Sequence, residues 1–200
     1  IKELVKIRNP STKYTADELH KAALAHIAID NLEEYGVWVH YPWSHRLVHL
    51  TDEEEFIEIR TSRNQYKITR DEQAVLRQKK IGVIGLSVGQ SVAITLIMER
   101  ICGEIRIADF DRLELTNMNR IRTGIHNLNL PKVYATAREI SEIDPFIKVL
   151  CFRDGATQEN LDAFFMEGGH LDLLIEESDG MDIKVLSRIK ARRSHAPSRL

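Results

Sequence analysis

The stretch from residue 81 to residue 111, IGVIGLSVGQSVAITLIMERICGEIRIADFD, decides the fold. It holds a short apolar run at residues 81–84, a second strand-like stretch at residues 105–108 and, between them, a longer segment at residues 88–101 that is mostly apolar. Short, fully apolar runs are typical of strands that a parallel sheet buries on both faces. A longer segment that is apolar nearly all round is typical of a buried helix. The order strand, helix, strand therefore predicts a β-α-β unit.

The same alternation continues towards the C-terminal end of the chain. Further helices are expected at residues 131–143, Leu161–Met166 and 182–193, and further strands at residues 147–152 and 171–175. We therefore expect an α/β fold over residues 69–200, with a Rossmann-like, mostly parallel sheet and helices on both of its faces. Four strands are recognisable, and the last helix should lead into a fifth. We thus expect the chain to be a fragment of a longer protein.

Residues 1–68 show a different pattern, which we interpret as a small α+β region made of a helix and a hairpin. A helix is expected from about residue 16 to residue 34, because apolar side chains recur at helical spacing there. Thr15 and Glu18 match a capping box at its start, and Gly36 is a typical terminator. Strand-like runs follow at Val37–Tyr41, Arg46–Leu50 and residues 56–60.

Histidine and cysteine side chains give little support to metal or thiol chemistry. The spacing of His40, His45 and His49 crosses a predicted turn and matches no zinc pattern, so we interpret them as surface or core residues. Two cysteines, Cys102 and Cys151, are too few for a disulfide framework or a four-cysteine zinc site. Both are expected to be buried packing residues rather than nucleophiles.

Composition and charge exclude several broad classes of function. The formal charge of −2 gives no overall attraction to nucleic acids or anionic membranes. No apolar run reaches the ~18 residues that a bilayer crossing needs, and the N-terminal stretch lacks the apolar core of a signal peptide. The last helix is basic, but no aromatic residue follows Phe165, so we interpret it as a solvated face. We expect a cytoplasmic protein with no nucleic-acid or membrane partner.

A nucleotide site is predicted where the first strand of the sheet turns into its helix. Gly85 and Gly89 flank this turn, where glycine permits a tight bend and lets a phosphate approach bare N–H groups at a helix N-terminus. The G-x-x-x-G pattern alone fits a plain turn equally well, because it lacks the middle glycine of a dinucleotide fingerprint. Asp109 ends the second strand, where an acid can hold a ribose hydroxyl, and Asp111 follows it. The combination favours a nucleotide.

A polar cluster follows the second strand. Lys132 falls in the first turn of its helix, where a cation is unfavourable unless an anion lies nearby. Arg120 can make forked contacts with phosphate oxygens, and Asn117 can contact a phosphate or a ribose. Each residue alone fits a solvated loop. Together with the glycine turn, they indicate a site for a polyphosphate.

The order of these elements resembles the E1-like superfamily, the group of ThiF, MoeB, HesA and the ubiquitin-activating enzymes. The matching elements are Gly85 to Gly89, Asp109-Phe-Asp111, Asn117-x-x-Arg120, Pro131-Lys132 and Ser178-Asp179. They lie within about residues 79–197, and Asn-x-x-Arg after Asp-x-Asp is the most specific of them. The N-terminal region resembles longer E1-like proteins that some bacteria carry fused to a nitroreductase-like domain.

The resemblance implies a role for individual residues. Asp109 would hold the ribose of ATP. Asn117, Arg120 and Lys132 would contact its phosphates. Asp179 would help to hold Mg²⁺ and ATP.

The resemblance also implies the reaction, an ATP- and Mg²⁺-dependent adenylation of a carboxylate. The substrate would be the C-terminus of a ubiquitin-like or sulfur-carrier protein, or another carboxylate. The enzyme would be a homodimer, and Arg63, in Ser62-Arg63-Asn64-Gln65, would match an arginine that reaches into the partner subunit's site. The chemistry agrees, because negative charge that builds on phosphoryl oxygens calls for cations and Mg²⁺.

Two alternatives remain open at the level of sequence. The glycine turn and Asp109 also permit an NAD-dependent oxidoreductase, which would leave the Asn117, Arg120 and Lys132 cluster unexplained. Ser87 and Val88 stand where the family usually has glycine, and the bulkier loop also permits a non-catalytic nucleotide-binding module.

Overall fold

The computed structural model describes residues 1–28, 31–194 and 196–199. The chain divides into two compact units, Ile1–Thr69 (unit 1) and Arg70–Leu200 (unit 2). None of the described helices combines the length and the apolar character that a bilayer crossing requires.

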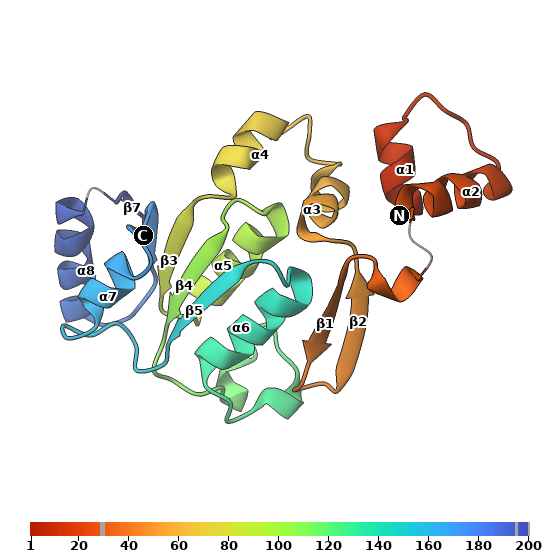
Figure 1. Ribbon diagram of the computed structural model, residues 1–200. Coiled ribbons are helices and arrows are strands. Elements are labelled where there is room, and N and C mark those ends of the chain that lie inside the picture. Colours follow the sequence, from red (N-terminus) through yellow and green to blue (C-terminus); the bar gives the residue numbers. More distant parts are fainter. Residues whose placement is uncertain (29–30, 195, 200) are drawn as a thin grey trace. The chain divides into compact units, whose positions relative to one another are not determined.

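Unit 2 is built on a five-stranded sheet in which every neighbouring pair of strands is parallel (Figure 1). The strands are β3 (Lys80–Ile84), β4 (Glu104–Ala108), β5 (Lys148–Phe152), β6 (Leu173–Glu176) and β7 (Ser198–Arg199). Their order in the sheet is β5-β4-β3-β6-β7, so the direction in which strands are added reverses between β3 and β6. The structure confirms the expected parallel sheet, including a fifth strand after the last helix.

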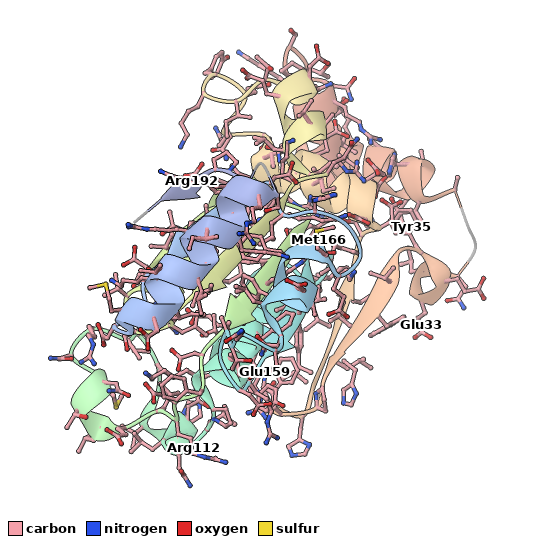
Figure 2. The ribbon with its side chains drawn as sticks, turned by 90° about the vertical axis from the view of Figure 1, so that its left-hand side faces the viewer. Glu33, Tyr35, Arg112, Glu159, Met166 and Arg192 are labelled. Carbon is pink, nitrogen blue, oxygen red and sulfur yellow. The ribbon has the colours of Figure 1, made fainter. Side chains whose placement is uncertain are left out.

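Helices cover both faces of this sheet, as expected. The helices of unit 2 are α4 (Arg70–Leu76), α5 (Gly89–Glu99), α6 (Lys132–Ile143), α7 (Leu161–Met166) and α8 (Met181–Arg193). Helices α5 and α6 pack on one face, while α7 and α8 pack on the other, the side that Figure 2 presents to the viewer. Successive side chains of β3 point to opposite faces of the sheet and so contribute to the hydrophobic core on each face. Val83 packs with α5 and α6, while the next residue, Ile84, packs with α7 and α8.

Two details of unit 2 differ from the sequence-based expectation. Pro131 is the N-cap of α6 rather than its first helical residue. Cys102 is fully buried as expected, but Cys151 is exposed. The reason is that Cys151 lies on β5, which has a neighbouring strand on one side only.

Unit 1 contains a hairpin among short helices. Its elements are α1 (Lys2–Arg8), α2 (Ala16–Ile27), the 3-10 turn η1 (Leu32–Glu34), β1 (Val37–Tyr41), β2 (Arg46–Leu50) and α3 (Glu53–Thr61). The capping box of Thr15 and Glu18 is confirmed, as is the antiparallel pairing of β1 with β2.

Two predictions for unit 1 were wrong. The helix expected up to residue 34 ends at Ile27, because Ala28 adopts a left-handed conformation and a separate 3-10 turn follows at Leu32–Glu34. The run at residues 56–60 is not a strand but part of α3. Asp52 caps this helix by accepting a hydrogen bond from the backbone N–H of Glu55, and acidic residues fill its first turn, which favours a helix.

Candidate functional site

A cavity of about 270 Å³ lies at the carboxyl ends of the central strands of unit 2. Its walls come from the turn after β3, the acidic loop after β4, the loop after β5 and the loop between β6 and α8. This position is the point between β3 and β6 at which the strand order reverses. Ligands of open α/β sheets bind in the crevice at such a point. The fold alone therefore marks this cavity as the candidate site.

The glycine turn brings two walls of the cavity together. Gly85 has a φ of +85°, and a Cβ there would lie 2.7 Å from backbone atoms of Glu177 and Ser178. Only glycine permits both this conformation and this approach. Gly89 has a different task, because a Cβ at Gly89 would lie 2.9 Å from a methyl group of Val83, and Gly89 does not line the cavity. Gly85 shapes the site, whereas Gly89 lets α5 pack on the sheet.

Asp109 ties the glycine turn to the acidic loop. Its Oδ2 accepts a hydrogen bond from the backbone N–H of Leu86 at 2.7 Å, and its Oδ1 accepts one from Asp111 at 2.7 Å. The residue is 8% exposed and lines the cavity. A carboxylate has about four acceptor positions, so two of them remain for the hydroxyl groups of a ligand.

The ammonium group of Lys132 lies directly behind the cavity wall. Its Nζ is 2.7 Å from Asp111 Oδ2 and 3.8 Å from Asp109 Oδ2, and it donates a hydrogen bond to Ser87 Oγ at 3.2 Å. Only 3% of Lys132 is exposed, and it does not line the cavity, although all three of its partners do. A buried charge needs such partners, because the cost of desolvating it is otherwise several kcal/mol.

Two more residues of the expected site lie in the cavity wall. Arg120 is exposed there, and its guanidinium donates hydrogen bonds to Thr116 O and Asn119 Oδ1 at 3.3 and 3.0 Å. Asp179 lies in the loop between β6 and α8 and is also exposed. Both side chains therefore face solvent that a ligand would displace.

Not every expected residue of unit 2 lines the cavity. Asn117 is 7% exposed, its Oδ1 accepts a hydrogen bond from the backbone of Glu114 at 3.1 Å, and it does not line the cavity. Its visible task is to fix the 3-10 turn η2 (Leu115–Asn117). Arg63 belongs to unit 1 and is exposed in the turn after α3. The roles that the resemblance implies for these two residues stay predictions.

Sequence reasoning missed several residues of the site. Glu177 lines the cavity, and Glu176 behind it is 1% exposed. Glu176 Oε1 accepts hydrogen bonds from the backbone N–H of Ser178, at 2.8 Å, and from the Ser178 hydroxyl. These bonds fix the loop that carries Asp179. The sequence did contain a signal for these residues, because an acidic residue, Glu176, ends β6 just as the acidic residue Asp109 directly follows β4.

The charges around the cavity fit a nucleotide that brings a divalent cation with it. Asp109, Asp111, Glu177 and Asp179 place carboxylates in the wall, while Arg120 adds a cation. Within the described residues, no group of three or more His, Cys, Asp or Glu side chains could hold a metal ion by itself. Mg²⁺ is typically bound through one or two carboxylates together with substrate phosphates, so a partial acidic set agrees with Mg²⁺ carried by ATP.

The two thiols of unit 2 are not activated. Burial raises the pKa of Cys102 to about 12. Although Cys151 is an exposed residue, desolvation of its thiol raises its pKa to about 11. Because a thiolate is the reactive form, neither cysteine is suited to act as a nucleophile at neutral pH.

Comparison with known proteins found relatives by sequence and by structure. A model described as "ThiF family" matches residues 61–193. The chain is 42% identical over 159 residues to "Uncharacterized protein MT1398" of Mycobacterium tuberculosis (strain CDC 1551 / Oshkosh), covering 80% of this chain and 22% of that protein. It is 29% identical over 119 residues to ubiquitin-like modifier-activating enzyme 5 of Aedes aegypti, covering 55% and 30% of the two chains.

Among solved structures, the chain is similar to Escherichia coli tRNA N6-threonylcarbamoyladenosine dehydratase in complex with ATP. The TM-score is 0.65 at 26% identity, over 70% of this chain and 58% of that one. In all three comparisons the chain spans less than two thirds of the length of the relative it matches.

Proposed function

Because this chain belongs to the ThiF family, we propose that unit 2 binds ATP with Mg²⁺ and adenylates a carboxylate. The observation that carries the proposal is the shared cavity of Gly85, Asp109, Arg120 and Asp179 at the point where the strand order reverses. These residues come from three different loops, and their meeting is what a nucleotide site needs. The similar dehydratase structure that contains ATP supports the same assignment.

Each residue has a task that follows from its position. The free acceptor positions of Asp109 suit the ribose hydroxyls, and the turn that begins at Gly85 leads into the N-terminus of α5, where phosphates are favoured. Arg120 supplies a cation at the wall, and Asp179 is the carboxylate that would meet Mg²⁺. Lys132 adds positive charge from behind the wall.

The reaction needs charge stabilisation rather than proton transfer. An oxygen of the ionised substrate carboxylate attacks the α-phosphorus of ATP and forms an O–P bond. The bond from that phosphorus to the bridging oxygen breaks, and pyrophosphate leaves with the electron pair. Mg²⁺, when bound, would neutralise part of the phosphate charge. Arg120 would stabilise the charge that develops on the phosphoryl oxygens.

We further propose that the carboxylate is the C-terminus of a ubiquitin-like or sulfur-carrier protein. Similarity to a ubiquitin-like modifier-activating enzyme supports this substrate class. The similar tRNA dehydratase shows by its name that relatives also act on a modified tRNA base, and this is the second candidate class. A cytoplasmic homodimer, in which Arg63 reaches the partner subunit's site, is part of the same proposal.

The test is carboxylate-dependent exchange of labelled pyrophosphate into ATP, with candidate carrier proteins and small carboxylates offered in turn. We expect Arg120→Ala to lower the exchange rate by about a hundredfold, the usual effect of removing one transition-state donor. Arg122→Ala is the matched control, because Arg122 is 78% exposed, pairs with Glu139 and does not line the cavity. Absence of exchange with every carboxylate, or equal rates for the two variants, would contradict the proposal. Thermal shifts with ATP–Mg²⁺ and with NAD separate it from an oxidoreductase.

A further inference from the structure

Ser87 stands between the buried ammonium of Lys132 and the cavity. Its Oγ is 3.2 Å from Lys132 Nζ, and Ser87 lines the cavity whereas Lys132 does not. The side chain of Lys132 is only 4% exposed. The direct hydrogen bonds and ion pairs that this ammonium group makes therefore go to groups that line the cavity, not into the cavity itself.

The direction of the hydrogen bond between these two groups is fixed by chemistry. An ammonium group has three donors and no acceptor, so the Ser87 oxygen must accept. The hydrogen of the Ser87 hydroxyl is then left for a different acceptor. A hydroxyl that accepts from a cation is also polarised, which makes it a stronger donor.

The other groups that Lys132 contacts cannot relay its charge to an anion. Asp111 and Asp109 are carboxylates and would repel a phosphate. Ser87 is the partner of Lys132 that can offer a hydrogen to a negatively charged ligand. It also lies in the turn that begins at Gly85, and it lines the same cavity as the exposed cation Arg120.

We propose that Ser87 is a phosphate-binding residue, which accepts a hydrogen bond from Lys132 and donates its own hydroxyl hydrogen to a phosphoryl oxygen of the nucleotide. This rests on the proposed function, because the nucleotide site is the one described above. It gives a task to a side chain at a place where the sequence alone suggested only a bulkier loop. With Ser87 in place of a glycine, the turn has a side-chain hydroxyl donor that is hydrogen-bonded to the buried ammonium of Lys132.

The test compares ligands with and without phosphates by isothermal titration calorimetry. The purified protein is titrated with ATP and Mg²⁺, and separately with adenosine. We expect Ser87→Ala to weaken ATP binding by about tenfold or more, the loss typical of a hydrogen bond to a charged group, and to leave adenosine binding unchanged. Ser87→Thr keeps the hydroxyl and should restore ATP binding to within about threefold of wild type.

Ser91→Ala is the matched control, because Ser91 is exposed on the first turn of α5 and does not line the cavity. It should bind both ligands as wild type does. The inference is overturned if Ser87→Ala binds ATP as wild type does, or if it loses affinity for ATP and adenosine equally, which would indicate a purely structural role.

These outcomes are separate from those that test the proposed function. A wild-type protein that binds ATP in a Ser87-dependent way but catalyses no carboxylate-dependent exchange would overturn adenylation and support the role of Ser87. If the wild-type protein catalyses carboxylate-dependent exchange while Ser87→Ala keeps full affinity for ATP, adenylation would be supported and the role of Ser87 would be overturned.

Discussion

Replacing Asp109 by asparagine tests whether this carboxylate holds the site together. Asp109 is 8% exposed, and each of its oxygens accepts a backbone hydrogen bond at 2.7 Å, one from Leu86 and one from Asp111. In Asp109→Asn, one oxygen becomes an NH₂ group, which faces a backbone N–H donor instead of accepting from it. The turn and the acidic loop then lose one of the two bonds that fix them.

The size of the effect follows from this geometry. A hydrogen bond to a charged group contributes about 1.5–3 kcal/mol, and a buried donor without a partner adds its own desolvation cost. We therefore expect the free energy of unfolding of unit 2 to fall by about 3 kcal/mol. With a denaturant slope of about 2 kcal/mol/M, the midpoint in urea would fall by about 1.5 M.

The assay must report unit 2. Both tryptophans of the chain, Trp38 and Trp43, lie in unit 1, so tryptophan fluorescence follows the wrong part of the molecule. Hydrogen exchange measured by mass spectrometry across a urea series, on peptides from residues 81–111, follows the affected strands directly.

Asp154→Asn is the control for this prediction. Asp154 is 79% exposed and pairs with Arg153, which is also exposed, so its replacement should change the stability by less than about 0.5 kcal/mol. If Asp109→Asn behaved like Asp154→Asn, the carboxylate would not be what joins the turn to the loop, and the account of the site would be wrong.

Three further predictions follow from the geometry and the pKa shifts. Gly85→Ala should lower the stability of unit 2 by about 3 kcal/mol or more in urea unfolding, through the positive φ and the overlap with the β6 loop; a loss under about 1 kcal/mol would contradict this. Burial opposes ionisation of Asp172, but hydrogen bonds from Lys79 and a backbone N–H outweigh it and lower its pKa from the usual value of an aspartate. A carboxyl group whose pKa is lowered by folding stabilises the fold at pH values above its unfolded-state pKa, and this stabilisation is lost as the pH falls through its folded-state pKa. The free energy of unfolding of Asp172→Asn should therefore decrease less than that of wild type when the pH is lowered into the acid range. Alkylation of Cys102 and Cys151 by iodoacetamide at neutral pH, followed by mass spectrometry, should be much slower than that of a free thiol, because their pKa values are about 12 and 11.

Much of unit 2 was predictable from the sequence because each strand carries its own signal. Residues 81–84 form a fully apolar run that is buried on both faces. Residues 105–108 are buried as well, although they include Arg106, whose guanidinium donates hydrogen bonds to Glu104 and to the backbone carbonyls of Phe164 and Gly169. The exposure of Cys151 was not predictable, because it depends on which strand ends up at the edge of the sheet.

Unit 1 was less predictable because its local signals conflict. Residues 57–60 alternate apolar and charged side chains as a strand would, yet the cap at Asp52 and the acidic first turn make them helical. Where a run is this short, a capping interaction just before it outweighs its periodicity.

The site was predictable in its residue types but not in its contacts. The sequence indicated Gly85, Asp109, Arg120 and Asp179, and the structure places them around one cavity. The sequence alone could not show that Lys132 lies behind the cavity wall, because this position depends on the distance between α6 and the turn after β3.

The central claim is that ATP occupies the cavity between the turn after β3 and the loop after β6. A crystal structure of the protein with ATP and Mg²⁺ tests this most directly. The account predicts that the ribose hydroxyls lie within hydrogen-bond distance of Asp109 and that the phosphates lie between Ser87 and Arg120. A nucleotide bound elsewhere on the protein, or one whose phosphates point away from the turn at Gly85, would contradict it.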